Sequence, residues 1–361
     1  MKKLDDHTPL GATTDTWSHR LSAARDLVQR TLAQHGLSGG SDVAPSAPAG
    51  NVMQDMMAKL QRGLGAGHPS PAPGGASADM QHGTFTCAAG QRDYRLYVPE
   101  SHGKQVTGLI VMLHGCTQTP EDFAAGTGMN ALAARHRLAV LYPEQSRGSN
   151  AQSCWNWFSP GDQRRDRGEP AILSGMTQKV AQQLGVPAEQ TYVAGLSAGA
   201  AMAVILGETY PDVFAAVGAH SGLPMGAARD VASAFAAMAG SGADTTASAT
   251  GSPTVPTIIF HGTADTTVHP VNGARIFQRA RNGDLSQSRH EESSGSTGGR
   301  DFKRATVTGA GGGVLLDHWV VDGLAHAWSG GQAAGSYTDG AGPDASAEML
   351  AFFLQTKGIA R

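Results

Sequence analysis

The chain has 361 residues, of which 27 are lysine or arginine and 30 are aspartate or glutamate, so its formal net charge is -3. This near balance leaves no broad basic field, and we therefore expect neither nucleic acid nor anionic lipid as a partner. The apolar fraction of 40% suits a globular core, while no stretch approaches the about 18 consecutive apolar residues that a membrane-spanning helix needs.

The first 82 residues are expected to form an appendage to a main domain over 83–361. Apolar residues near helical spacing predict two short amphipathic helices, within 17–37 and 52–60. The Gly-, Pro-, Ser- and Ala-rich segments between and after them cannot offset the entropy cost of ordering, which indicates flexible linkers. A loosely attached tail is the simpler interpretation, and docking of the helices on a surface or granule is the alternative.

Signals for a cellular compartment are sparse. The two lysines near the start are not followed by an apolar run, so we expect no secretory signal peptide and favour a cytoplasmic location. An extracellular or periplasmic location is the alternative. Three cysteines are too few for a disulfide scaffold and match no zinc spacing, so we expect no metal and no cofactor, while one disulfide stays open.

From residue 84 onward, strand and helix patterns alternate. Residues 84–99 predict a β-hairpin, and the apolar run over 108–115 predicts a strand buried on both faces. Further strands are expected at 138–143, 191–197, 214–222, 257–262 and 318–323, and helices at 121–136, 172–184 and 198–210. This alternation predicts a mostly parallel central sheet flanked by helices, with ligands bound beyond the carboxyl ends of the strands.

Two segments interrupt this alternation. Residues 226–254 and 282–300 are rich in Gly, Ser, Ala and Thr and carry no clear periodic pattern. We expect them to be surface insertions near the cleft.

The sequence Gly195-Leu196-Ser197-Ala198-Gly199 lies between a predicted strand and a predicted helix. A strand, a sharp turn and a helix are the context that a nucleophile elbow requires, so Ser197 is the candidate nucleophile. The two glycines let strand and helix approach each other, and Ala198 keeps the rim open. An ordinary Gly-rich turn is the alternative, which the flanking patterns disfavour.

A serine nucleophile needs a histidine base held by a carboxylate, and in this fold they follow the serine in the order acid, then histidine. Asp265 follows the strand predicted at 257–262 and is the candidate acid, although an Asx-turn residue would look the same. Asp317 and Asp322 are weaker candidates because they lie too close to the last strand. His326, in the loop after that strand, is the candidate base. The remaining histidines after Ser197 at plausible positions are given structural or pocket-lining roles: His220, His261, His269 and His318.

Acyl transfer also needs two N–H groups where negative charge develops on the carbonyl oxygen. One is expected from Ala198, the residue after the nucleophile. The second is expected from the loop after the strand at 108–115, where we favour the Cys116 N–H. The neighbouring side chains of His114 and Gln118 are candidates for substrate contact, and a simple tight turn is the alternative for this loop.

Several segments together resemble the polyhydroxybutyrate depolymerase-type esterases, which are related to feruloyl and acetylxylan esterases. The resemblance covers roughly residues 84–356 and implies an α/β-hydrolase fold, no metal, and hydrolysis of short-chain hydroxyalkanoate, aryl or acetyl esters. It assigns the same roles to the same five residues: Ser197, Asp265, His326, Cys116 and Ala198. The segments that carry it are LHGCTQTPEDFAAGTGMNALA, LYPEQ, CWNWF, GLSAGAAMA, YPDVFAAVGAHSGLP, HGTADTTVHP and GLAHAWSGG.

The segment CWNWF resembles the part of the family that lies beside the cleft. Trp155 and Trp157 are therefore candidates to pack on the acyl or alcohol part of an ester, and Trp328 in GLAHAWSGG is a third. The alternative is that the aromatic pair forms a hydrophobic plug.

The same resemblance suggests that Cys154 pairs with Cys116, which would tie the oxyanion loop to the aromatic segment. In a reducing cytosol the two would stay as thiols instead. Cys87 would have no partner in either case.

Two other functions are weighed against this one. Within enzymes, the runner-up is a feruloyl or acetylxylan esterase. Outside enzymes, the chain could be a catalytically silent α/β-hydrolase that acts as a binding protein, which the complete Ser, Asp and His set argues against. Secreted members of the family carry a signal peptide and often a substrate-binding domain, patterns not found here, so we expect soluble esters or oligomers rather than solid polymer as substrates.

Overall fold

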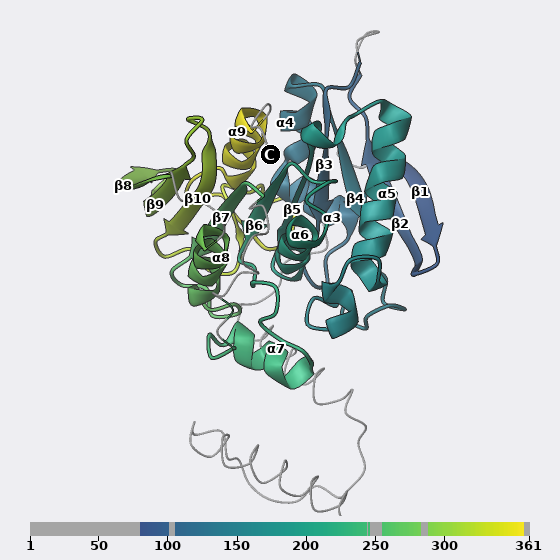
Figure 1. Cartoon of the computed structure of the whole chain (residues 1–361). Helices are drawn as coiled ribbons and strands as arrows, with labels where there is room; N and C mark the ends of the chain where they lie inside the picture. The colour runs from purple at the N-terminus through teal and green to yellow at the C-terminus, as the bar shows by residue number, and fades with distance from the viewer. Residues whose placement is uncertain (1–79, 101–104, 244, 246–254, 283–287, 357–361) are drawn as a thin grey trace, which may run out of the picture. The chain divides into compact units, whose positions relative to one another are not determined.

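The computed structural model describes residues 80–100, 105–243, 245, 255–282 and 288–356 (Figure 1). The two amphipathic helices and the linkers expected within residues 1–79 lie outside this described part. The first described strand starts at Met80, three residues before the predicted boundary at residue 83.

A ten-stranded sheet runs through the described main domain, in the order β1-β2-β4-β3-β5-β6-β7-β10-β9-β8. Strands β4, β3, β5, β6, β7 and β10 are parallel, and the antiparallel hairpins β1/β2 and β8/β9 extend the two edges. The strands of this sheet are β1 Met80–Cys87, β2 Gly90–Tyr97, β3 Gly108–Leu113, β4 Leu138–Pro143, β5 Thr191–Leu196, β6 Ala216–His220, β7 Thr257–Gly262, β8 Arg289–Thr297, β9 Arg300–Thr308 and β10 Val314–Val321. A separate small sheet pairs β11 Trp328–Ser329 with β12 Thr338–Asp339.

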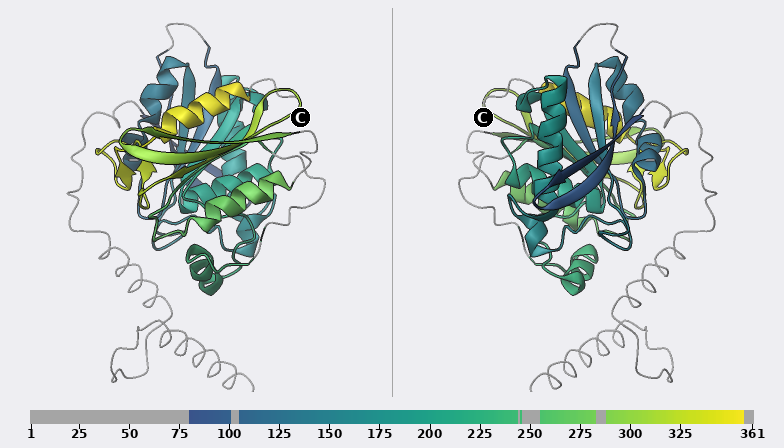
Figure 2. Two further views of the ribbon diagram at one scale, coloured as in Figure 1. Left: turned by 90° about the vertical axis from the view of Figure 1, so that its left-hand side faces the viewer. Right: turned by 90° about the vertical axis from the view of Figure 1, so that its right-hand side faces the viewer.

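Helices cover both faces of the large sheet (Figure 2). Helices α4 and α9 pack together on one face, and α6 and α8 lie on the other, with α5 against α6. The helices are α3 Pro120–Thr127, α4 Met129–Arg135, α5 Gly168–Leu184, α6 Ala198–Thr209, α7 Val231–Met238, α8 Val271–Arg281 and α9 Ala345–Gln355, with short 3-10 helices at Pro160–Gln163 and Ala188–Gln190. Within the described residues, no helix combines the length and apolarity needed to cross a membrane.

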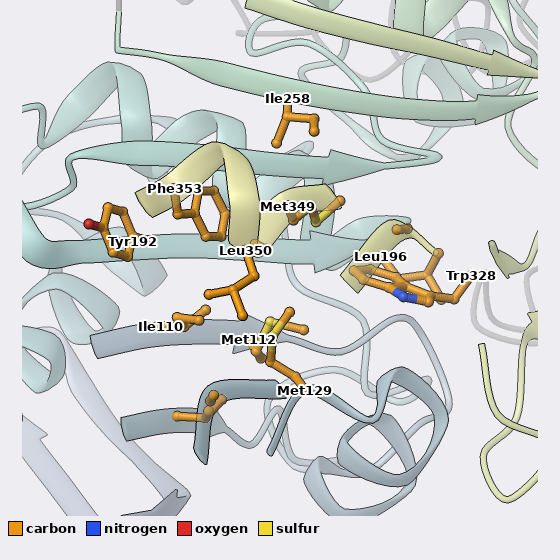
Figure 3. Close-up of a cluster of buried hydrophobic side chains, with 14 of the residues drawn as sticks. Ile110, Met112, Met129, Tyr192, Leu196, Ile258, Trp328, Met349, Leu350 and Phe353 are labelled. Carbon is orange, nitrogen blue, oxygen red and sulfur yellow. The ribbon is translucent and has the colours of Figure 1, made fainter. Parts of the chain in front are cut away.

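The main apolar core lies between the sheet and the α4/α9 layer (Figure 3). Tyr192 of β5 stacks on Phe353 of α9 with ring centroids 5.0 Å apart, and Met349 and Leu350 lie beside them. Because helices cover both faces, every residue of β5 is buried. This rigid sheet fixes the positions from which the loops at its carboxyl edge begin.

The structure confirms the predicted α/β fold and matches the strands expected at 138–143 and 257–262 to the residue. The single helix expected over 121–136 is instead two helices. Gly128 adopts φ 60 and caps α3, so the chain turns before α4 begins.

The two segments expected to be insertions contain regular structure. Within 226–254, Asp230 and Ser233 form a capping box that starts α7. Within 282–300, β8 pairs with β9, but all nine of its residues are exposed. A strand with no buried face shows no apolar alternation, which is why its sequence pattern resembles a loop.

Candidate active site

Ser197 lies at the sharp turn between β5 and α6. Its backbone adopts φ 57 and ψ -118, a conformation that side-chain-bearing residues rarely hold. A Cβ on Gly195 would collide with the backbone of Gly199, and one on Gly199 would collide with the Leu113 carbonyl oxygen. The glycines therefore allow strand and helix to meet closely enough to form the elbow, as the sequence predicts.

Asp265 follows β7 and His326 follows β10, and the two side chains meet at the carboxyl edge of the sheet. His326 Nδ1 lies 2.7 Å from Asp265 Oδ2. The other carboxylate oxygen accepts hydrogen bonds from the N–H groups of Thr267 at 3.0 Å and Val268 at 2.8 Å. With Nδ1–H donated to the carboxylate, Nε2 is the ring nitrogen that can accept a proton.

A second histidine lies against the same carboxylate. His261 Nε2 is 2.8 Å from the Val268 carbonyl oxygen and 3.5 Å from Asp265 Oδ2. Burial acts to raise the pKa of Asp265, but the hydrogen bonds from His261 and His326 outweigh it and hold that pKa well below its ordinary value. Asp265 is therefore a carboxylate whenever the enzyme is near neutral pH.

The third group of the candidate site is the hydroxyl of Ser197, the candidate nucleophile. The residue is 8% exposed, as is His326. Among the described residues, the Ser197 hydroxyl has no hydrogen-bond partner. Catalytic hydrogen bonds are often long without substrate and tighten when it binds, so the lack of a partner for this hydroxyl does not exclude Ser197 as the nucleophile.

Two backbone N–H groups, one at the start of α6 and one in the loop after β3, are candidates for the oxyanion donors. Ala198 is the first residue of α6, so its N–H has no partner within the helix. Among the described residues, no atom accepts a hydrogen bond from the Cys116 N–H. A Cβ on Gly199 would also meet the carbonyl of His114, which shows how closely the start of α6 approaches the loop after β3.

Cys116 and Cys154 form a disulfide, with their Cα atoms 4.3 Å apart across a sequence separation of 38. The bond ties the loop after β3 to the segment after β4. Cys87, on β1, is a free thiol.

Three of the predicted substrate contacts are buried supports of the loop after β3. His114 is 0% exposed, and its Nε2 accepts a hydrogen bond from Gln145 N while Nδ1 contacts the Gly115 carbonyl oxygen. Burial lowers the pKa of His114 to about 4, so the ring is neutral. Trp155 donates Nε1–H to the His114 carbonyl, and Gln118 accepts from the Gly115 N–H. With their polar atoms used in this way, the three side chains position the loop instead of lining a substrate site.

The other two tryptophans are also buried. Trp328 is 1% exposed, packs edge-on against Phe123 in the core and donates Nε1–H to Ser346 Oγ at 3.0 Å. Trp157 is 6% exposed and packs edge-on against Phe158. Trp155 is 0% exposed, so for the pair Trp155 and Trp157 the hydrophobic-plug alternative fits the structure better than direct contact with an ester.

A buried polar cluster next to the loop after β3 was not predicted from the sequence. The Glu169 carboxylate accepts hydrogen bonds from Arg92, from the side chain of Gln145, and from both the backbone and the side chain of Asn156. Gln145 in turn donates to the Cys154 carbonyl and, through its backbone N–H, to His114. Because Glu169 and Arg92 are 77 residues apart, no local pattern could have paired them.

The comparisons with known proteins agree on the family. Residues 92–285 match the family model described as Esterase PHB depolymerase. The chain is 34% identical over 230 residues to Poly(3-hydroxyalkanoate) depolymerase C of Paucimonas lemoignei, covering 60% of this chain and 54% of that protein. It is 28% identical over 280 residues to Poly(3-hydroxybutyrate) depolymerase of Ralstonia pickettii, covering 72% and 56% respectively. The chain thus spans about half the length of these curated relatives.

Acetylxylan esterases are also similar. Acetylxylan esterase A of Emericella nidulans is 29% identical over 157 residues, covering 43% of this chain and 49% of that protein. The structure of an acetyl xylan esterase from Aspergillus awamori superposes with a TM-score of 0.59 at 19% identity, covering 76% of this chain and 99% of that one, which supports the α/β-hydrolase fold. From its sequence match, the chain belongs to the PHB depolymerase family of esterases.

Proposed function

We propose that the chain is a serine esterase in which Ser197, His326 and Asp265 form the catalytic triad. The observation that carries this proposal is the 2.7 Å contact between His326 and Asp265, at the same sheet edge as the strained turn that holds Ser197. All three residues follow strands of one rigid sheet, in the chain order that this fold uses.

The chemistry follows from these positions. His326 Nε2 takes the proton of Ser197 Oγ as that oxygen attacks the ester carbonyl carbon, while Asp265 holds the ring and stabilises its positive charge. The N–H groups of Cys116 and Ala198 donate to the oxyanion of the tetrahedral intermediate. Collapse breaks the bond to the alcohol, which leaves with the proton from His326, and water then releases the acid from the acyl-enzyme by the same route.

The substrates proposed are short-chain hydroxyalkanoate esters or their oligomers. The names of the two bacterial relatives, both depolymerases of hydroxyalkanoate polymers, support this class. A second candidate is an acetylated xylan or a related feruloyl ester, supported by the similarity to acetylxylan esterases.

The test combines a fluorophosphonate probe with a panel of esters. We expect the probe to label the wild type at Ser197 and to leave Ser197→Ala unmodified. The panel holds methyl esters of different chain length, hydroxybutyrate oligomers, a hydroxycinnamate ester and acetylated xylan. A wild-type protein that resists the probe would be a silent binding protein, and faster turnover of xylan or hydroxycinnamate would favour the second candidate.

A further inference from the structure

Two hydroxyl groups meet beside the candidate triad. Thr117 Oγ1 and Tyr337 Oη lie 3.2 Å apart, although the residues are 220 positions apart in the sequence. Thr117 is exposed and Tyr337 is half-buried, so the pair faces solvent. Neither residue was singled out from the sequence, since only the fold brings them together.

Each residue of the pair adjoins a different residue of the proposed site. Thr117 directly follows Cys116, whose N–H is the proposed donor. The ring of Tyr337 meets the imidazole of His326 edge-on, with centroids 6.5 Å apart. Each hydroxyl therefore belongs to a residue next to a group that the proposed mechanism places against the ester.

The surrounding structure holds both residues in place. Thr117 and Tyr337 adopt φ 67 and φ 52, conformations that are strained for a β-branched and for an aromatic residue. The Tyr337 carbonyl accepts a hydrogen bond from Trp328 N at 2.7 Å, and the preceding Ser336 donates its N–H to Asp122 Oδ1 at 2.8 Å. Such strain persists only where neighbouring contacts fix the backbone, so the two hydroxyls are presented rigidly.

We propose that Thr117 and Tyr337 determine specificity by binding an oxygen on carbon 3 of the acyl chain, either a free hydroxyl or the ester oxygen of the next unit in an oligomer. This inference rests on the proposed esterase function and narrows its substrate class. Both hydroxyls can donate and accept, so they can exchange their mutual hydrogen bond for bonds to the substrate oxygen. A plain alkyl chain offers no such partner, so the two hydroxyls keep only their mutual hydrogen bond and the substrate gains none.

The experiment compares methyl 3-hydroxybutyrate with methyl butyrate, which differ by one hydroxyl and share the same leaving group. Release of acid is followed by titration at constant pH, and the quantity measured is the ratio of kcat/KM for the two esters. We expect the wild type to prefer the hydroxy ester and Tyr337→Phe or Thr117→Val to lower that ratio by about fivefold, the effect of one uncharged hydrogen bond. Thr117→Ser, which keeps the hydroxyl, should retain the preference.

Tyr210→Phe is the matched control, because Tyr210 lies away from these loops and its hydroxyl accepts a hydrogen bond from Asp166 N. It should leave the ratio unchanged. A wild-type ratio near one, or an equal loss on both esters in Tyr337→Phe, overturns the inference. Hydrolysis of both esters by Ser197→Ala would instead overturn the proposed function, so the two failures are distinguishable.

Discussion

At the scale of single residues, the strongest feature is the backbone of Ser197. Its positive φ makes the sharp turn between β5 and α6, and the absence of side chains on Gly195 and Gly199 leaves room for that turn. The sequence predicts this arrangement well because glycine, serine and glycine at this spacing, between a strand and a helix, are typical of a nucleophile elbow. The sequence also singles out Asp265 and His326, because the fold fixes the order of acid and base along the chain, and the structure places these two side chains 2.7 Å apart.

The first prediction concerns these three residues. Ser197→Ala and His326→Ala should each lower kcat by about 10⁴-fold or more, since the first removes the proposed nucleophile and the second the proposed base. Asp265→Asn should be somewhat less damaging, because it misorients the imidazole without removing it. Steady-state kinetics on a methyl ester measure all three. Retention of more than about a tenth of the wild-type rate by His326→Ala would move the base to another histidine.

Residues that support the site could not be predicted as well. Tyr337 and Glu169 act through contacts between distant parts of the chain, and no local spacing marks them. Conversely, Trp155 and Trp328 look like pocket residues in sequence, but their indole N–H groups bond to other buried groups. Aromatic side chains beside a motif are equally compatible with a core, and only their contacts decide between the two.

At the scale of elements, the loop after β3 is held from behind by the Glu169 cluster. Every group that contacts the Glu169 carboxylate is a hydrogen-bond donor. Glu169→Gln would turn an amide NH₂ toward some of these donors and loosen the link through Gln145 to His114. We expect kcat to fall about tenfold with KM within about twofold, because misplacing an oxyanion donor affects the transition state most.

Asp317→Asn is the control for this variant. Asp317 is a buried carboxylate that pairs with Arg304 on neighbouring strands, through contacts of 2.9 Å and 2.7 Å. Both variants should lower the melting temperature, since each disturbs a buried ion pair. If Asp317→Asn lowers kcat as much as Glu169→Gln, the cluster contributes stability alone and does not position the loop.

Element prediction succeeded where burial imposes a pattern and failed where it does not. The inner strands are continuous apolar runs because helices cover them on both sides. The edge strand β8 is polar and exposed, and α7 is short and begins at a capping box within an Ala- and Ser-rich segment. For such elements, pairing with another strand or a single capping residue decides the structure, whereas their composition is typical of a loop.

At the scale of the whole molecule, three buried histidines make stability depend on pH. Burial lowers the pKa of His114 to about 4, of His220 to about 3 and of His318 to about 4. In the unfolded chain these histidines have a pKa of about 6.5, so below that pH the unfolded chain binds protons that the folded chain does not bind. The free energy of unfolding therefore falls as the pH falls from about 6.5 toward the folded-state pKa values. At pH 5 each histidine should cost about 2 kcal/mol relative to pH 7.5.

Urea unfolding at pH 7.5 and pH 5 measures this loss. Glu169 acts in the opposite direction, because burial raises its pKa and protonation then favours the folded state, so the total is smaller than the sum over the three histidines. His318→Gln, which cannot titrate, should reduce the loss by about 2 kcal/mol. An unfolding free energy that stays constant between the two pH values would contradict the prediction.

The amino-terminal region should be dispensable for chemistry. Its composition cannot build a core, and every candidate site residue lies within 114–337. A chain that begins at residue 77, three residues before β1, is expected to fold and to hydrolyse soluble methyl esters at the full-length rate. Circular dichroism and kinetics on both chains test this, and loss of folding would show that residues 1–76 cover part of the core.

The disulfide between Cys116 and Cys154 makes the properties of the protein depend on the redox conditions in which it folds. A chain that stays reduced is about 2 Da heavier than an oxidised one, a difference that intact mass shows directly. By loop length alone, the bond stabilises the fold by about 3 to 4 kcal/mol. Since it also anchors Cys116, whose N–H is the proposed oxyanion donor, reduction should lower kcat more than it raises KM. Protein made in a reducing compartment should therefore have a lower catalytic rate than protein made in an oxidising one. The kcat of protein purified from its natural cell, compared with the kcat of these two preparations, would indicate whether the disulfide forms there.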